Sequence, residues 1–104
     1  MAESKSLCLH IVTLECKDSK SATDCLEALK LYGRPDARLF RCVSYEFGLK
    51  VGHQDTIYLV EHWNSWEDLD ALLKEKVIPA LPTYNTFLKR PFNPQTDAVR
   101  IRLC

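Results

Sequence analysis

Residues 58 to 63 read Tyr-Leu-Val-Glu-His-Trp, an apolar strand-like run that is interrupted by an acid and an imidazole. Glu61 could move protons, and Trp63 could stack on a flat aromatic ligand. His10 adds a second imidazole within another apolar segment, residues 7 to 16. These residue types suit general acid–base chemistry on a small molecule, provided that the fold encloses them.

Each of these side chains also has a purely structural interpretation. Glu61 could accept hydrogen bonds or pair with Arg41 or Arg100 instead of acting as a base. A single histidine on an apolar strand, such as His10, is often a core residue whose hydrogen bonds are satisfied. Trp63 could pack in the core without touching a ligand. The sequence leaves open which of Glu61 and His10 would be the base.

Four strands are predicted from β-branched, aromatic and alternating residues. They cover residues 7–16, 39–48, 56–63 and 98–104. The second and third strands are separated by a short segment that contains Gly52, so they are expected to pair as a hairpin.

Two helices are predicted between the strands from capping signals and helical spacing of apolar residues. The first follows a capping box at Ser21 and Asp24 and is expected to stop at Gly33, before Pro35. The second begins at Ser65, is followed by Asp68 as its capping partner, and carries Trp66, Leu69, Leu72, Leu73 and Lys76 on one side. Pro79 and Pro82 are expected to break it, with one more helical turn possible in residues 81–89.

The order β-α-β-β-α-β predicts an α+β, ferredoxin-like fold, with residues 1–104 as a single domain. Both helices of this fold cover the same face of the sheet. Residues 7 to 16 are nevertheless apolar on both faces, so the second face also needs a cover. A second copy of the chain is the simplest cover, which predicts a homodimer that packs sheet against sheet.

The more purely apolar side of each strand should face the helices. This places Tyr58 and Val60 on the helix side, together with residues 43, 45 and 47. Leu59, Glu61 and Trp63 are then expected on the opposite face, between the sheet and the second copy. We expect His10 and the neighbouring side chains Phe40, Cys42 and Ser44 there too, although a slip of one residue would reverse the assignment.

The segment from Cys42 to Leu73 resembles the antibiotic biosynthesis monooxygenase family. Ser44-Tyr45-Glu46 takes the place of its "sYe" strand, and Tyr58 with Glu61-His62-Trp63 the place of its "yExW" strand. The resemblance implies a dimeric α/β barrel, often with cofactor-free oxidation of an electron-rich aromatic or quinol by dioxygen. Leu59 stands where the aromatic-polyketide members carry a catalytic asparagine, and residues 76–82 lack the histidine of the heme-degrading members.

The first strand is also similar to the start of the stress-responsive A/B barrel family, which includes a plant polyketide cyclase. In that cyclase a histidine of this strand faces the pocket, and His10 matches it. This resemblance implies a barrel that binds a small apolar ligand, with cyclase or lyase chemistry or with none.

Composition argues against several other classes of protein. Acidic and basic residues balance at 14 each, whereas a nucleic-acid binder usually has a basic excess. The five cysteines include no Cys-x-x-Cys pair, so we expect no metal site and free thiols in a reducing compartment. No transmembrane run and no signal peptide is visible, which makes the cytoplasm the expected location.

Two functions follow from these patterns. The first is a small monooxygenase without a cofactor, with Glu61 or His10 as base and Trp63 placing an aromatic or quinol substrate. The second is a non-catalytic or cyclase-type barrel for a small apolar ligand. Five residues are predicted to contact the ligand: Phe40, Cys42, Ser44, Leu59 and Arg100.

Overall fold

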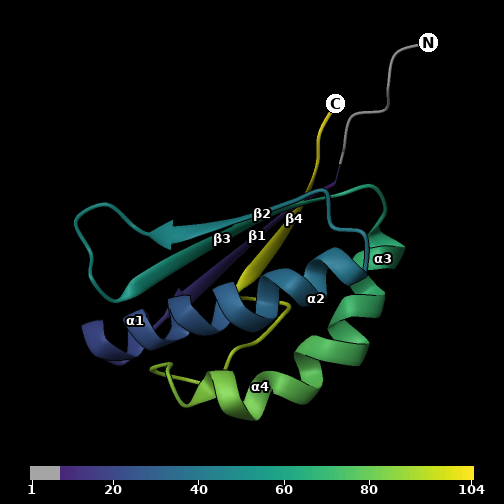
Figure 1. Ribbon diagram of the computed structural model, residues 1–104. Coiled ribbons are helices and arrows are strands. Elements are labelled where there is room, and N and C mark those ends of the chain that lie inside the picture. The colour runs from purple at the N-terminus through teal and green to yellow at the C-terminus, as the bar shows by residue number, and fades with distance from the viewer. Residues whose placement is uncertain (1–7) are drawn as a thin grey trace.

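The computed structural model describes residues 8–104. Leu7, the first residue of the predicted first strand, lies outside the described residues. So does the N-terminal segment for which the absence of a signal peptide was predicted. Four strands form one antiparallel sheet in the order β2-β3-β1-β4. Their bounds are Cys8–Glu15 (β1), Ser44–Leu49 (β2), Thr56–Trp63 (β3) and Ala98–Arg102 (β4). All the helices lie on one side of this sheet (Figure 1), which confirms the α+β, ferredoxin-like fold.

The first helical arm consists of α1 (Ser19–Ala28), a π-helical turn η1 (Leu29–Gly33) and α2 (Arg34–Leu39). The second helical arm consists of α3 (Trp66–Leu72), a π-helical turn η2 (Leu73–Val77) and α4 (Ile78–Asn85). None of the helices described is long and apolar enough to cross a membrane.

The prediction that prolines end both helices is wrong. Pro35 and Pro79 each sit in the first turn of the helix that follows a π-helical turn, and Pro82 lies inside α4. In each π turn the backbone bond spans five residues, from the Arg34 and Ile78 N–H groups to the carbonyls five residues before them. The wider turn relieves the clash between a proline ring and the preceding turn, so each helix continues past its proline.

The helix starts are capped by single side chains. Ser65 accepts a hydrogen bond from the Asp68 N–H at 3.2 Å, as the predicted start of the second helix requires. The first helix is capped by Asp18, which accepts from the Ser21 N–H at 2.7 Å, and not by the predicted Ser21–Asp24 box. This hydrogen bond lowers the pKa of the Asp18 carboxyl.

The second strand starts later than predicted. Leu39 belongs to α2, and Arg41 adopts a positive φ of 72° that turns the chain toward the sheet. Positive φ is uncommon outside glycine, and no residue pattern in this segment marks it.

The register between β2 and β3 decides which side chains meet the helices. Tyr45 pairs with Glu61 and Phe47 with Leu59, while the Lys50 N–H donates to the Thr56 carbonyl at 2.9 Å and closes the hairpin. Directly paired residues share a face, so Leu59 and Glu61 lie on the same face as Tyr45. The predicted faces of β3 are therefore wrong by one residue.

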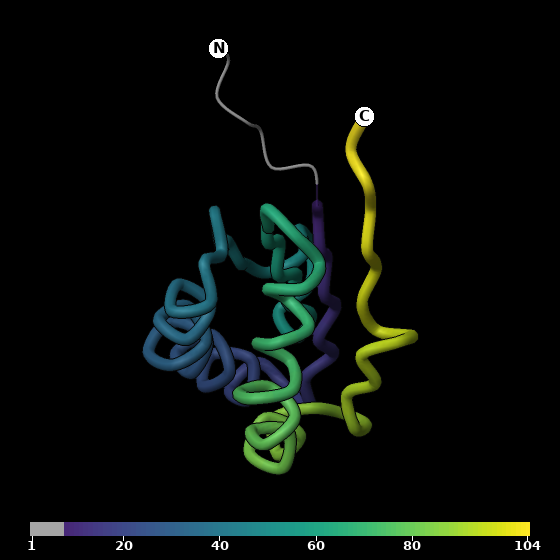
Figure 2. Tube along the Cα trace, turned by 90° about the vertical axis from the view of Figure 1, so that its right-hand side faces the viewer, coloured from purple at the N-terminus to yellow at the C-terminus, as the bar shows by residue number. Residues whose placement is uncertain are grey.

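We call the sheet side under the helices the closed face and the other side the open face. The core lies on the closed face, with Val12, Leu14, Ile57 and Trp63 against helix residues such as Leu69. The open face carries Leu9, Ile11, Tyr58, Val60, Val99 and Ile101, and no described helix covers it (Figure 1). In Figure 2, β4 runs beside β1 as the edge of the sheet.

This face assignment predicts that substitutions at two neighbouring positions lower the free energy of unfolding by different amounts. Leu59→Ala should lower the free energy of unfolding by about 2–5 kcal/mol, because Leu59 is 5% exposed and its loss leaves a cavity. Val60→Ala, on the open face, should cost about 1 kcal/mol or less. Urea unfolding of both variants tests this, and a larger loss for Val60→Ala would contradict the register.

Candidate active site

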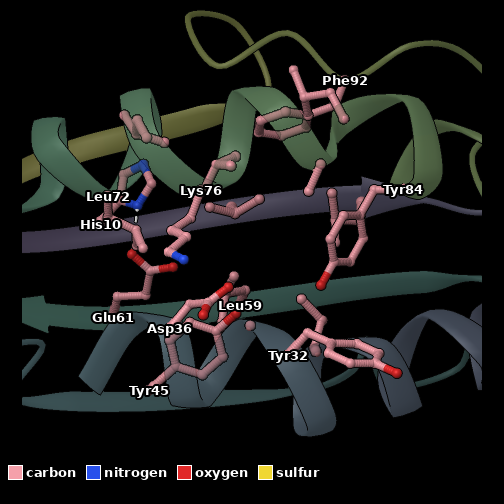
Figure 3. Close-up of a pocket in the computed structure, with 18 of the residues that line it drawn as sticks. His10, Tyr32, Asp36, Tyr45, Leu59, Glu61, Leu72, Lys76, Tyr84 and Phe92 are labelled. Atoms are coloured by element: carbon pink, nitrogen blue, oxygen red, sulfur yellow. Dashed lines mark hydrogen bonds and ion pairs between the residues drawn. The ribbon is translucent and has the colours of Figure 1, made fainter. Parts of the chain in front are cut away.

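A cavity of about 120 Å³ lies between the closed face of the sheet and the two helical arms. Its floor comes from the sheet, and one wall comes from each arm (Figure 3). Most of its lining is apolar, including Val12, Leu29, Leu59, Leu72, Val77 and Leu81. This volume is somewhat below the ~150 Å³ of an engineered cavity that binds benzene, so the enclosed space is at most about the size of one aromatic ring, and longer ligands would extend through the opening.

The polar end of the cavity is built around the Glu61 carboxylate. Its Oε1 atom lies 2.9 Å from His10 Nδ1 and accepts a hydrogen bond from Trp63 Nε1 at 2.8 Å. His10 and Glu61 are each 4% exposed, and Trp63 is fully buried. A carboxylate this deeply buried is stable only with such partners, so the three side chains form one hydrogen-bonded unit.

The carboxylate decides where the imidazole proton lies. An ionised carboxylate only accepts hydrogen bonds, so His10 Nδ1 carries the hydrogen that points at Glu61. His10 Nε2 is then a free acceptor. Neither Nε2 nor Glu61 Oε2 has a partner among residues 8–104, and neither is sealed away from solvent. In Figure 3, the second Glu61 oxygen is directed into the cavity.

Strand pairing brings these residues together. Across the sheet, Tyr45, Glu61, His10 and Arg100 are consecutive partners on β2, β3, β1 and β4. Cross-strand partners have Cβ atoms ~5 Å apart, so the first three line up along one row of the floor. Tyr45 lies directly beside Glu61 in this row and also lines the cavity.

The far end of the cavity is closed by contacts of the second arm. The Tyr84 hydroxyl donates to the Ala28 carbonyl at 3.4 Å, which links α4 to α1. Burial raises the pKa of Tyr84 to about 12, so this hydroxyl stays protonated. Leu88, which bridges to Cys16 of the chain after β1, and Phe92 complete this end.

Two charged residues on opposite arms also line the cavity. Asp36 comes from α2, and the exposed Lys76 comes from η2. They form no ion pair within 4.0 Å in the part of the chain that the structure describes. Both π-helical turns face the cavity, since Leu29 and Gly33 of η1 and Leu73 and Val77 of η2 line it. π turns often occur at functional sites.

Three of the residues predicted for the site line this cavity: His10, Glu61 and Leu59. Trp63 donates a hydrogen bond to Glu61 but is fully buried and does not line the cavity. It therefore cannot stack on a ligand there. The prediction that His10, Glu61 and Trp63 gather in one place is correct, but they lie under the helices of their own chain. The predicted location between two sheets is wrong because of the one-residue register difference.

The other predicted ligand contacts lie elsewhere. Ser44 is on the open face, where its Oγ lies 2.9 Å from His62 Nδ1. Cys42 donates to the Ser44 carbonyl at 3.1 Å, and burial raises its pKa to about 12, which rules it out as a nucleophile near neutral pH. Phe40 packs at the core margin without lining the cavity.

Arg100 is engaged at the edge of the sheet. Its guanidinium donates to Asp70 at 2.6 Å and lies 5.2 Å from the centre of the Trp66 ring. Both partners belong to α3, so the contacts of Arg100 link the second arm to β4. It contacts neither Glu61 nor the cavity.

Sequence reasoning missed several lining residues, chiefly Tyr45, Asp36, Tyr84 and Phe92. Tyr45 stands within the "sYe" motif, which was one available signal. Lys76 was another, because a lysine on the apolar side of a predicted helix is unusual. No cluster of His, Cys, Asp and Glu that could hold a metal ion occurs among residues 8–104.

No protein-family model matches the chain, and no curated protein does. Solved structures do resemble it. A conserved protein of Methanosarcina mazei Go1 superposes with a TM-score of 0.76 at 12% identity, covering 95% of each chain. A candidate antibiotic biosynthesis monooxygenase of Nitrosomonas europaea gives 0.75 at 14% identity, covering 98% of this chain and 94% of that one.

A dimeric ferredoxin-like protein from an uncultured marine organism gives a TM-score of 0.69 at 14% identity, covering 96% of this chain and 90% of that one. At these identities the likeness establishes the fold. It does not establish a reaction.

The hydrogen bond from His10 to Glu61 predicts a specific tautomer. In the protein with Glu61 intact, His10 should carry its hydrogen on Nδ1, whereas Glu61→Gln, whose amide can donate, should shift it toward Nε2. Nitrogen NMR of the imidazole rings distinguishes the two forms, with the exposed His53 as an internal control. An unchanged His10 signal in the variant would contradict the geometry.

Proposed function

We propose that the protein is a small monooxygenase that needs no cofactor and oxidises an electron-rich aromatic or quinol-type molecule with dioxygen. The observation that carries the proposal is the His10–Glu61 pair at the buried polar end of an apolar, ring-sized cavity. The monooxygenase name of a structural neighbour supports the same reaction class. A buried, hydrogen-bonded acid–base pair in such a cavity is a common active-site arrangement.

His10 Nε2 acts as the general base. It takes the proton of a substrate hydroxyl or activated C–H group, while the Glu61 carboxylate on Nδ1 stabilises the imidazolium that forms. Trp63 holds the carboxylate in the orientation that this requires. Glu61 and Trp63 are therefore positioning residues, and His10 is the group that touches the substrate.

The substrate supplies all the electrons. The anion passes one electron to dioxygen, which gives superoxide and a substrate radical, and these combine at an activated carbon that still carries one hydrogen to form a C–O bond. The O–O bond then breaks, one oxygen remains as a carbonyl, and the other leaves as water with that hydrogen and the proton held by His10. The apolar walls limit water around the anion and so favour electron transfer.

The second candidate function is binding, or cyclase-type chemistry, in the same cavity. The position of His10 favours it, because His10 lines the cavity as the stress-responsive A/B barrel resemblance implies. This candidate uses the base without dioxygen. The two candidates therefore differ in oxygen uptake.

Oxygen consumption with a panel of single-ring quinols and phenols tests the first function. His10→Gln should reduce the rate by about 10²–10⁴-fold, the contribution of a general base, and Glu61→Gln should reduce it less. The exposed residues His53 and Glu27 provide matched controls as His53→Gln and Glu27→Gln. Ligand binding without oxygen uptake would favour the second candidate, and equal uptake in all variants would refute His10 as base.

We also propose that two copies pair through the open face. Val99 is 55% exposed, Tyr58 39% and Ile101 37%, so residues 8–104 of one chain leave apolar side chains exposed on this face of the sheet. A neighbour of the same fold is named dimeric, which supports this arrangement. The cavity itself lies within one chain, so dimerisation is not what encloses it.

The pairing predicts the effect of charge on the open face. The double variant Val99→Glu with Ile101→Glu should give monomers, because buried unpaired carboxylates oppose the contact. Leu31→Glu, at an exposed position of the first arm, is the control and should leave the mass unchanged. Light scattering after size exclusion measures both, and a monomeric unmodified protein at micromolar concentration would refute the dimer.

A further inference from the structure

Tyr45 is a buried polar residue that neither function above uses. It is 7% exposed, and its ring stands edge-on to Phe47, with centroids 6.0 Å apart. Tyr45 lines the cavity, and its hydroxyl has no hydrogen-bond partner within residues 8–104. Figure 3 shows the ring rising from β2 toward the interior of the cavity. No fully buried polar side-chain atom among the described residues lacks a partner, so this hydroxyl oxygen is open to the cavity, where water or a ligand can bind it.

Gly33 leaves the space that this hydroxyl occupies. A Cβ at position 33 would lie 2.4 Å from the Tyr45 oxygen, closer than atoms approach without a shift. The backbone of Gly33 is helical, with φ −62°, so no unusual conformation demands glycine there. The requirement is one of space, and it falls in the π-helical turn η1.

The Tyr45 hydroxyl stays protonated. Burial raises its pKa, and the nearby Glu61 carboxylate raises it further. A neutral phenol donates one hydrogen bond, and the close approach of Gly33 limits where the Tyr45 oxygen can lie. Such a donor stabilises negative charge that develops on an oxygen beside it.

We propose that Tyr45 donates a hydrogen bond to an oxygen of the ligand and so helps to select phenols and enols for the cavity. The inference rests on the proposed base-driven function and narrows its substrate class to molecules that place such an oxygen beside Tyr45. Glu61 lies between Tyr45 and His10 in the row of strand partners, so this contact is separate from that of the base. Tyr45 only donates the hydrogen bond and loses no proton.

Other charges also reach the cavity and would act on a bound anion. Glu61 disfavours it, Lys76 favours it, and Asp36 disfavours it, while the Tyr32 and Tyr84 hydroxyls are further lining groups. Substitution of Tyr45 alone leaves all of these in place. A comparison between single variants therefore isolates the contribution of the one hydroxyl.

The test uses 4-nitrophenol, whose ionised form absorbs visible light and whose neutral form does not, so no oxygen or turnover is needed. The apparent pKa of the bound probe is measured by titration in the whole protein. Tyr45→Phe should raise this pKa by about one unit or more, the effect of losing a hydrogen bond to a charged oxygen. With an oxidisable substrate, the same variant should lower kcat on the order of 10²-fold.

Gly33→Ala provides an independent variant that keeps the hydroxyl but displaces it, and it should raise the pKa of the bound probe in the same direction. Tyr58→Phe on the open face and Gly48→Ala, which has open space around its Cα, are the matched controls. Neither control should change the probe.

The outcomes separate the two proposals. If 4-nitrophenol does not bind to the unsubstituted protein at all, both the substrate class and the role of Tyr45 are refuted. If it binds and Tyr45→Phe leaves its pKa unchanged, the role of Tyr45 alone is refuted. Thermal unfolding of each variant confirms that the comparison is between folded proteins.

Discussion

The buried carboxylate of Glu61 is the constraint on which the site depends. A charge that is 4% exposed needs hydrogen-bond donors from its own surroundings, and His10 and Trp63 supply them on one oxygen. Satisfying this oxygen fixes the imidazole tautomer and leaves His10 Nε2 free. The arrangement that stabilises the charge in the fold therefore also prepares a base.

The two helical arms provide the cavity over this pair. Each arm contains a π-helical turn just before a proline, at Pro35 and at Pro79, and both turns line the cavity. Tyr84 links the two arms at the far end of the cavity, and Arg100 links the second arm to the edge of the sheet. The cavity lies between the two arms and the sheet.

The two faces of the sheet have separate roles. The closed face carries the acid, the imidazole and the phenol in one row of strand partners, and the helices of the same chain cover them. The open face carries scattered apolar side chains and the Ser44–His62 pair, which suit contact with another sheet. The proposed chemistry and the proposed self-association therefore depend on different residues.

The order of elements, the ferredoxin-like fold and the bounds of β3 follow from the sequence, because period and turn signals are local. The selection of His10, Glu61 and Trp63 as one group also came from residue type and strand parity. Two features did not follow from the sequence. The prolines at 35 and 79 are strong stop signals, yet π-helical turns accommodate them, and no local pattern indicates this.

The face on which Glu61 lies was decided only by the tertiary structure. In a strand, a shift of one residue in pairing moves every side chain to the other side, and both sides of β3 are apolar enough to be buried. Hydrophobicity alone cannot choose between them. The choice comes from the hairpin closure at Lys50 and Thr56 and from the donors His10 and Trp63, which lie far apart in the sequence and meet only when the sheet has formed.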